Sequence, residues 1–215
     1  MAKKKIVLIG GGGHCKVVIS ILKKLDKFEI AGIVDNYKVG SLISGVKIIG
    51  TDDNLRDIYK SGIHCALITV GSTKDNTKRY KLFNIVREIG YEFPVIISPE
   101  AIVDESVKLD EGTVIMPGSI INIDSSIGKN CIINTGAIIE HDCKIENHCH
   151  IAPGVHISGA INLGELSFVG IGATIIQGIK IGENVTIGAG SVIIKDIPDN
   201  VIALGNPAKI IKRKN

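Results

Sequence analysis

The sequence predicts two units of different fold class: a small Rossmann-like α/β domain with a parallel sheet, followed by a parallel β-helix. Strand-like and helix-like segments alternate from residue 4 to about residue 90, and aliphatic residues recur every six positions from residue 101 to residue 196. Alternation favours a parallel sheet, and a strict six-residue period is typical of a β-helix. We therefore expect one domain at residues 1–95 and a second at residues 96–215.

The α/β unit begins with a short apolar run, a turn of four glycines and a segment with helical spacing of its apolar residues. Apolar runs of four to six residues predict buried strands, and apolar residues spaced three and four apart predict helices. On this basis we expect strands at residues 5–9, 30–34 and 65–70, and helices at residues 15–25 and 75–89.

In the second unit an aliphatic residue occupies every sixth position from Val103 to Ile193, in sixteen of sixteen repeats. The position two residues earlier is mostly small and includes Cys131, Cys143 and Cys149. Both positions are expected to face inward, which makes these cysteines core residues. The position after the aliphatic residue is rich in Asn, Asp and Gly, so we expect it to form the corner in left-handed backbone geometry. Residues 204–209 leave the repeat and are expected to fold back over its end.

Composition excludes several classes of protein. The net charge is +3, and the basic residues gather at residues 3–5 and 209–214, where solvated tails are more common than nucleic-acid sites. Five cysteines, an odd number, fit a reducing compartment. No apolar run approaches the ~18 residues of a membrane span, and the first run is too short for a signal peptide. We expect a cytoplasmic protein with no membrane span.

The densest polar cluster lies at residues 140–150. His141 and Asp142 fall at a corner, His148 falls at the equivalent place one repeat later, and His150 is expected to face outward from a flat side. These are either solvated surface histidines or a general base with its acid partner. Adjacent residues on a strand point to opposite sides, so Asp142 serves His141 of its own chain only if the corner bends the backbone. The nearby cysteines point inward and the histidines outward, so we expect no metal site.

A second candidate site is the glycine turn between the first strand and the first helix. Backbone N–H groups of such a turn can face a phosphate, and Asp35 ends the second strand where an acid often meets a ribose. Cys15 stands where the dinucleotide fingerprint requires glycine, which favours a diphosphate ligand over NAD. Positive charge is unfavourable at a helix start, so we expect a neutral His14 that binds a ligand. The alternative is a plain tight turn.

Together these motifs resemble the hexapeptide-repeat acyltransferases, and more closely the bacterial sugar acetyltransferases with an N-terminal nucleotide-sugar-binding domain. That group includes UDP-4-amino-sugar and GDP-perosamine N-acetyltransferases and the sialic acid O-acetyltransferases. The motifs are the Gly-Gly-His turn, Val34-Asp35-Asn36, Asn134-Thr135-Gly136, Glu140-His141-Asp142-Cys143 and Gly205-Asn206-Pro207-Ala208-Lys209. The resemblance implies a left-handed β-helix, acetyl-CoA as co-substrate, and a homotrimer with active sites between subunits.

The resemblance also implies residue roles. His141 matches the catalytic base and Asp142 the acid that increases its basicity. The positions that match the acetyl-CoA site are His150, Gly159, Ile171 and Ala189. The positions that match the nucleotide-sugar site are Gly12, Gly13, His14, Asp35, Asn36 and Gly71. Well-known members have Glu in place of Asp142, Asp in place of Asn36 and Ser in place of Gly12, so the identity of the nucleotide stays open.

The predicted function is therefore acetyl-CoA-dependent N-acetylation of a UDP- or GDP-linked amino sugar, in the synthesis of a bacterial surface glycan. O-acetylation of sialic acid or a related sugar is the alternative. A third possibility is a nucleotide-binding scaffold without chemistry, against which the pairing of His141 with an adjacent acid argues.

Overall fold

The computed structural model describes residues 3–37, 39–72 and 75–214. The first unit is a five-stranded sheet in the order β3-β4-β2-β1-β5, parallel except for the β3–β4 hairpin. Its strands are β1 (Lys4–Ile9), β2 (Phe28–Val34), β3 (Leu42–Ile43), β4 (Val46–Gly50) and β5 (Cys65–Ile68). Its helices are α1 (Gly13–Leu25), η1 (Asp52–Asn54), α2 (Leu55–Lys60) and α3 (Thr77–Ile89). None of the helices in these ranges is long and apolar enough to span a membrane.

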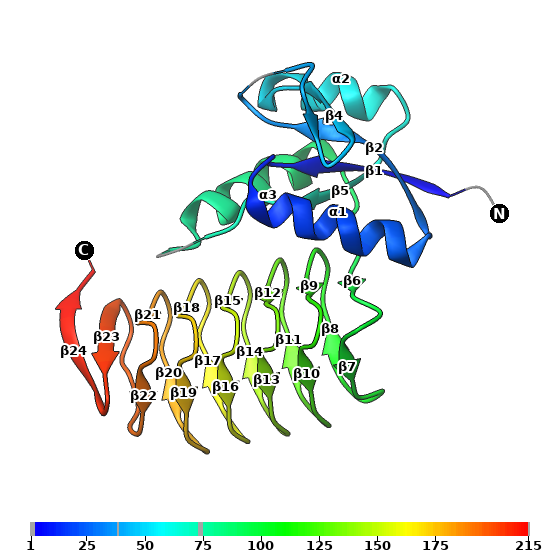
Figure 1. The fold of residues 1–215 in the computed structure, drawn as a ribbon. Helices are drawn as coiled ribbons and strands as arrows, with labels where there is room; N and C mark the ends of the chain where they lie inside the picture. Colours follow the sequence, from blue (N-terminus) through cyan, green and yellow to red (C-terminus); the bar gives the residue numbers. More distant parts are fainter. Residues whose placement is uncertain (1–2, 38, 73–74, 215) are drawn as a thin grey trace.

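Helices cover both faces of this sheet. On one face α2 and α3 bury Leu55 and Phe83 against the strands. On the other face, apolar residues of α1 such as Val18 share one cluster with Val114 and Met116 of the second unit. Helix α1 therefore lies between the sheet and the β-helix, as Figure 1 shows. Burial of these apolar side chains on both sides stabilises the contact between the two units.

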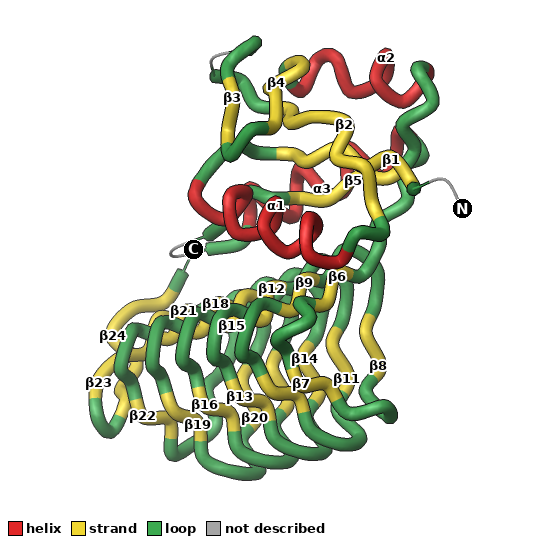
Figure 2. Tube along the Cα trace, turned by 45° about the vertical axis from the view of Figure 1, so that its right-hand side comes forward, coloured by secondary structure: helices red, strands yellow, loops and turns green. Residues whose placement is uncertain are grey.

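The second unit is a prism of three parallel sheets, which Figure 2 shows from the side. Successive coils pair with a shift of 18 residues, as Ile120 pairs with Ile138. Face 1 holds β6 (Ile96–Ile97), β9 (Val114–Ile115), β12 (Ile132–Ile133), β15 (His150–Ile151), β18 (Phe168–Val169), β21 (Thr186–Ile187), β23 (Val201–Gly205) and β24 (Ala208–Arg213). Face 2 holds β7 (Ile102–Val103), β10 (Ile120–Ile121), β13 (Ile138–Ile139), β16 (His156–Ile157), β19 (Thr174–Ile175) and β22 (Val192–Ile193). Face 3 holds β8 (Lys108–Leu109), β11 (Ser126–Ile127), β14 (Lys144–Ile145), β17 (Asn162–Leu163) and β20 (Lys180–Ile181).

The six-residue repeat predicted the core positions correctly, but its prediction for the corner residue is wrong. Cys131, Cys143 and Cys149 are buried in the prism, as the phase predicts. The left-handed residue, however, lies three places after the aliphatic residue, as at Asp124 and Asp142, and not one place after it. Glycine one place after the aliphatic residue has another cause. A Cβ at Gly164 would lie 2.5 Å from the backbone of Gly182 in the next coil, so close stacking excludes a side chain there.

The end of the chain folds back as predicted, with one difference. Residues 201–205 still extend face 1, because β23 pairs in parallel with β21. Strand β24 then returns antiparallel to β23 and ends the sheet. The hairpin thus adds two strands to face 1 at the C-terminal end of the prism (Figure 1).

Candidate functional site

The first candidate centre is the corner between β13 and β14, on the edge of the prism between faces 2 and 3. Asp142 adopts left-handed geometry with φ of 59°, and this bend brings its carboxylate beside the preceding side chain. His141 Nδ1 lies 2.7 Å from Asp142 Oδ2. The corner therefore bends enough for Asp142 to pair with His141 of its own chain. Both side chains stay more than half exposed, at 56 % and 60 %.

The pairing orients the imidazole. A carboxylate accepts a hydrogen bond, so the neutral ring of His141 carries its proton on Nδ1 and leaves the Nε2 lone pair free. Gly159, one coil further on, lies against the other edge of the ring. A Cβ at Gly159 would be 2.6 Å from Cε1 and Nε2 of His141, so only glycine leaves the ring in this position. The corner thus presents an accessible nitrogen base with an acid behind it.

The second predicted pair of histidines is buried, which corrects the expectation that they lie on the solvent side of the prism. His148, at the corner between β14 and β15, and His150, on face 1, both lie under the α/β domain, with 6 % and 5 % exposure. His148 packs edge-on against Tyr80 and Phe83 of α3. Repeat phase predicts the direction of a side chain from the prism, but the domain that covers face 1 decides its exposure.

Burial and a nearby cation hold both rings in the neutral form. Burial, with Arg79 next in importance, lowers the pKa of His150 to about 3 and that of His148 to about 4. Contact with the Ser72 backbone offsets part of the shift at His150. The Arg79 side chain is itself buried and donates to four acceptors, which are the carbonyl oxygens of Ile68, Val70 and Asn130 and the Asn130 side chain.

The glycine turn forms the second centre, at the carboxyl end of β1. Gly10 has φ of 106°, and the Gly11 N–H donates to Asp35 Oδ2 over 2.6 Å. A Cβ at Gly11 would lie 2.6 Å from Cδ1 of Ile43, so a larger residue here would displace that side chain. Helix α1 begins at Gly13, with Gly12 as its N-cap residue, and has no side-chain cap and no acidic residue in its first turn. An uncapped helix start of this kind suits an anion.

A cleft of about 710 Å³ opens at this turn. Gly12, Lys16 and Asp35 line one side, and the β3–β4 hairpin supplies Leu42 and Ile43 on the other. This hairpin was not among the elements predicted from the sequence. Its turn residues Ser44 and Gly45 both have positive φ, and Ser-Gly between apolar residues is a hairpin pattern that could have been recognised.

The other residues predicted for this centre differ in burial and in their hydrogen-bond partners. His14 stands beside Gly71, and its Nε2 is a buried side-chain atom that lacks a hydrogen-bond partner among the described residues. Burial, followed by the charges of Arg79 and His150, lowers the pKa of His14 to about 3, so the ring is neutral. Asn36 is already engaged, since its side chain exchanges two hydrogen bonds with Asp52. Gly13 has open space around it.

A third hollow crosses face 1 near the C-terminal end. This groove of about 700 Å³ contains Ile171 and Ala189, which the sequence analysis assigned together, with Phe168 and Leu204 as apolar neighbours. Lys214 stands at its polar end and bonds to Asn184. Among the described residues no group of three or more His, Cys, Asp and Glu side chains is placed to hold a metal ion.

Comparison with known proteins identifies the family. Residues 5–86 match the model of the PglD N-terminal domain, and residues 124–159 and 160–195 match the bacterial transferase hexapeptide model of six repeats. The fold matches perosamine N-acetyltransferase from Caulobacter crescentus, a variant solved with CoA and GDP-perosamine. That match has a TM-score of 0.93 and 40 % identity, and it covers 98 % of each chain. The chain belongs to the hexapeptide-repeat sugar acetyltransferases with a PglD N-terminal domain.

Two further solved structures are similar to this chain. The acetyltransferase domain of PglB from Neisseria gonorrhoeae, solved with acetyl coenzyme A, is 34 % identical over 98 % of this chain and 100 % of that one, with a TM-score of 0.91. WeeI from Acinetobacter baumannii is 25 % identical over 96 % and 99 % of the two chains, with a TM-score of 0.85. No curated protein matches the chain. The predicted fold class, an α/β domain followed by a left-handed β-helix, is confirmed.

A single copy of the acetyltransferase does not bring its candidate residues together. The α/β domain, with the glycine turn and the His14 ring, covers face 1 of the prism. His141 lies on the edge between faces 2 and 3, which is the edge opposite face 1. Ile171 follows β18 at the edge between faces 1 and 2. The glycine turn and His141 are therefore on different sides of one prism.

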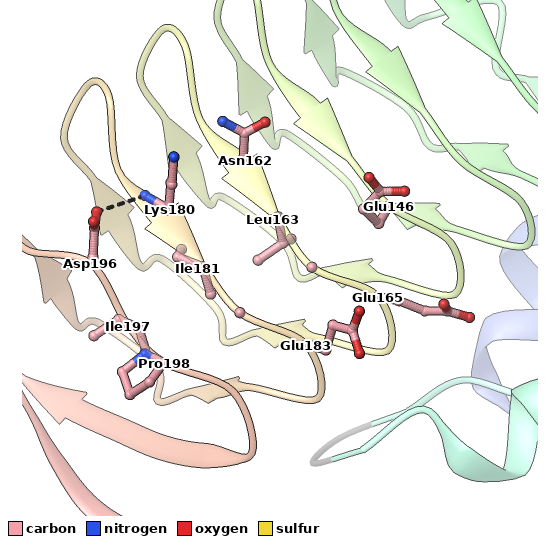
Figure 3. A pocket seen from close by; sticks show the side chains of 12 residues that line it. Glu146, Asn162, Leu163, Glu165, Lys180, Ile181, Glu183, Asp196, Ile197 and Pro198 are labelled. Carbon is pink, nitrogen blue, oxygen red and sulfur yellow. Dashed lines mark hydrogen bonds between the residues drawn. The ribbon is translucent and has the colours of Figure 1, made fainter.

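Face 3 carries one more hollow, of about 660 Å³, which Figure 3 shows from close by. Four acidic side chains line it together with the single cation Lys180; they are Glu146, Glu165, Glu183 and Asp196. Burial, and the neighbouring Glu183 and Glu146, raise the pKa of Glu165. None of the residues selected from the sequence lines this hollow.

Proposed function

We propose that this acetyltransferase moves the acetyl group of acetyl-CoA to the amino group of a UDP- or GDP-linked amino sugar. The observation that carries the proposal is the His141–Asp142 pair at 2.7 Å, in a chain 40 % identical to a perosamine N-acetyltransferase solved with CoA and GDP-perosamine. The relative's N-acetyl chemistry favours transfer to nitrogen over O-acetylation of a sialic acid.

His141 is the proposed general base. The sugar amine attacks the thioester carbonyl, a C–N bond forms, and Nε2 of His141 takes the proton that the amine loses. The C–S bond then breaks, and the proton passes to the leaving thiolate of CoA. Asp142 holds the Nδ1–H and stabilises the imidazolium that forms. Gly159 leaves room for the ring in this orientation.

The two substrates are proposed to bind in the hollows already described. A diphosphate is proposed at the uncapped start of α1, where Gly12 and Asp35 line the cleft. Gly13, His14, Asn36 and Gly71 are assigned to the same site from the family resemblance. Acetyl-CoA is proposed to pass Gly159, Ile171 and Ala189, with His150 near the acetyl group; Ile171 and Ala189 share one apolar groove.

We further propose a homotrimer whose active sites lie between neighbouring prisms. The support is geometric: His141 and the nucleotide-facing turn lie on opposite sides of one copy, so a second copy can supply the missing half. The apolar residues Ile123 and Ile171 are 51 % and 61 % exposed near prism edges, which suits contact with another chain. We propose a cytoplasmic enzyme of surface glycan synthesis, with the nucleotide-binding part at residues 1–95 and the transferase part at 96–215.

The test is release of free thiol from acetyl-CoA across a panel of acceptors: UDP- and GDP-linked 4-amino sugars, free sialic acid and CMP-sialic acid. Turnover with one nucleotide amino sugar, and formation of its N-acetyl product by mass spectrometry, is the expected result. Turnover with sialic acids alone would replace the proposal by O-acetylation. Failure to bind acetyl-CoA at all would reduce the protein to a nucleotide-binding scaffold.

A further inference from the structure

His150 is held at both ring nitrogens by side chains from the two domains. Its Nδ1 lies 2.8 Å from Ser72 Oγ, and its Nε2 lies 3.1 Å from Asn134 Nδ2. Each contact could run in either direction for a histidine considered alone, because the proton can sit on either nitrogen. The neighbours of His150 remove this ambiguity.

Asn134 is oriented by the backbone. Its Oδ1 accepts the N–H of Thr135 over 2.8 Å, so the other end of the amide, the NH₂ group, faces His150. An amide NH₂ can only donate. Nε2 of His150 must therefore accept, and the proton of the neutral ring stands on Nδ1.

Asn76 is oriented in the same way from the opposite end. Its Nδ2 donates to the carbonyl oxygens of Ser167 and Leu166, over 3.0 and 3.3 Å. Its Oδ1 therefore faces Ser72, whose hydroxyl donates to it over 2.5 Å. A serine hydroxyl has one proton, so Ser72 Oγ can only accept from His150. Both ends of the chain of hydrogen bonds lead to the same assignment, with the proton on Nδ1.

We propose that Ser72 is a positioning residue, which acts from the N-terminal domain and, together with Asn134, fixes the orientation of His150 with its proton on Nδ1. Ser72 directly follows Gly71, the residue beside His14 at the nucleotide-facing turn. The inference rests on the proposed function in two respects, that His150 contacts acetyl-CoA and that the N-terminal domain binds the nucleotide. Through Ser72, the domain that binds the nucleotide then also shapes the acetyl-CoA site.

The tautomer is tested without any activity. Long-range ¹H–¹⁵N spectra of ¹⁵N-histidine-labelled protein, with His150 assigned by its loss in His150→Gln, should show a protonated Nδ1 and a bare Nε2. Ser72→Thr keeps the hydroxyl and should keep this spectrum. Ser72→Ala leaves the Asn134 donor at Nε2, so it should keep the Nδ1–H tautomer but shift and broaden the Nδ1 signal, because the ring loses its second side-chain contact. A protonated Nε2 in the wild type, or an unchanged spectrum in Ser72→Ala, would overturn the proposal.

Affinity for CoA gives the second readout. We expect Ser72→Ala to raise the dissociation constant of CoA by about tenfold in calorimetry, as for loss of one buried hydrogen bond, and Ser72→Thr to restore it. Equal affinity in wild type and Ser72→Ala would remove the link to the acetyl-CoA site. If the wild type binds no CoA, the proposed function fails, and the spectra still decide the role of Ser72.

Discussion

Two histidines of one coil, His141 and His150, occupy opposite environments. His141 is more than half exposed, and among the described residues its ring bonds only to Asp142, through Nδ1. His150 is 5 % exposed, and both of its nitrogens are bonded. A base must accept a proton and reach its substrate, which only the first environment allows. The second environment fixes a ring in place, so it does not suit His150 to proton transfer.

The largest expected effect comes from removal of the exposed ring. His141→Ala should lower kcat roughly 10³-fold, because the attacking amine loses its base, while the KM for acetyl-CoA changes little. Thermal unfolding should be close to that of the wild type, because the side chain is exposed. Turnover near the wild-type rate would remove His141 from the mechanism.

Trimers that mix two different variants test whether the site lies between copies of the chain. If the site lies between copies, His141→Ala and Ile171→Trp damage opposite halves of it, and co-expression should assemble some intact sites from the undamaged halves. Activity well above that of either variant alone is the expected result. Absence of any recovery in trimers shown to be mixed would place the whole site within one chain.

Substitutions at two glycines should separate an effect on the active site from an effect on the stability of the fold. Gly159→Ala places a Cβ 2.6 Å from the exposed His141 ring, which can move aside, so kcat/KM should fall by roughly 10-fold to 100-fold with little loss of stability. Gly164→Ala places a Cβ 2.5 Å from backbone of the next coil, which cannot move freely. It should cost about 1–3 kcal/mol of stability and leave kcat/KM of the folded enzyme near that of the wild type. The reverse pattern, by assay and calorimetry, would refute this division.

The sequence was sufficient where a local repeat decides the outcome. The six-residue period predicted the inward positions of Cys131, Cys143 and Cys149, because a side chain's direction follows from its place in the coil. The corner geometry was misplaced by two residues, since glycine at Gly164 reflects close stacking and not left-handed backbone. Period alone does not separate these two reasons for glycine.

Burial of His148 and His150 lay beyond the repeat, because a residue's neighbours can come from distant sequence. Their partners Tyr80 and Ser72 belong to the other domain. The reach of Asp142 to His141 was likewise undecided until the φ of 59° was known. The candidate residues could be selected from motifs, whereas their grouping on opposite sides of the prism needed the structure.

The last prediction concerns the response of the three buried histidine rings to acidification. The pKa of His14 and His150 is about 3 and that of His148 about 4, all lowered mainly by burial, so the unfolded chain binds protons that the folded chain does not. Their stabilising contribution is complete above about pH 6.5 and is lost as pH falls toward these folded values. Below pH 6.5 each ring should contribute a loss of up to about 1.4 kcal/mol per pH unit. Urea unfolding between pH 6.5 and pH 5 measures the slope, and His148→Gln should reduce it by one ring's share. A free energy of unfolding that stays level over this interval would mean that the domain interface admits protonated histidines, and the contrast between the open corner and the closed interface would then fail.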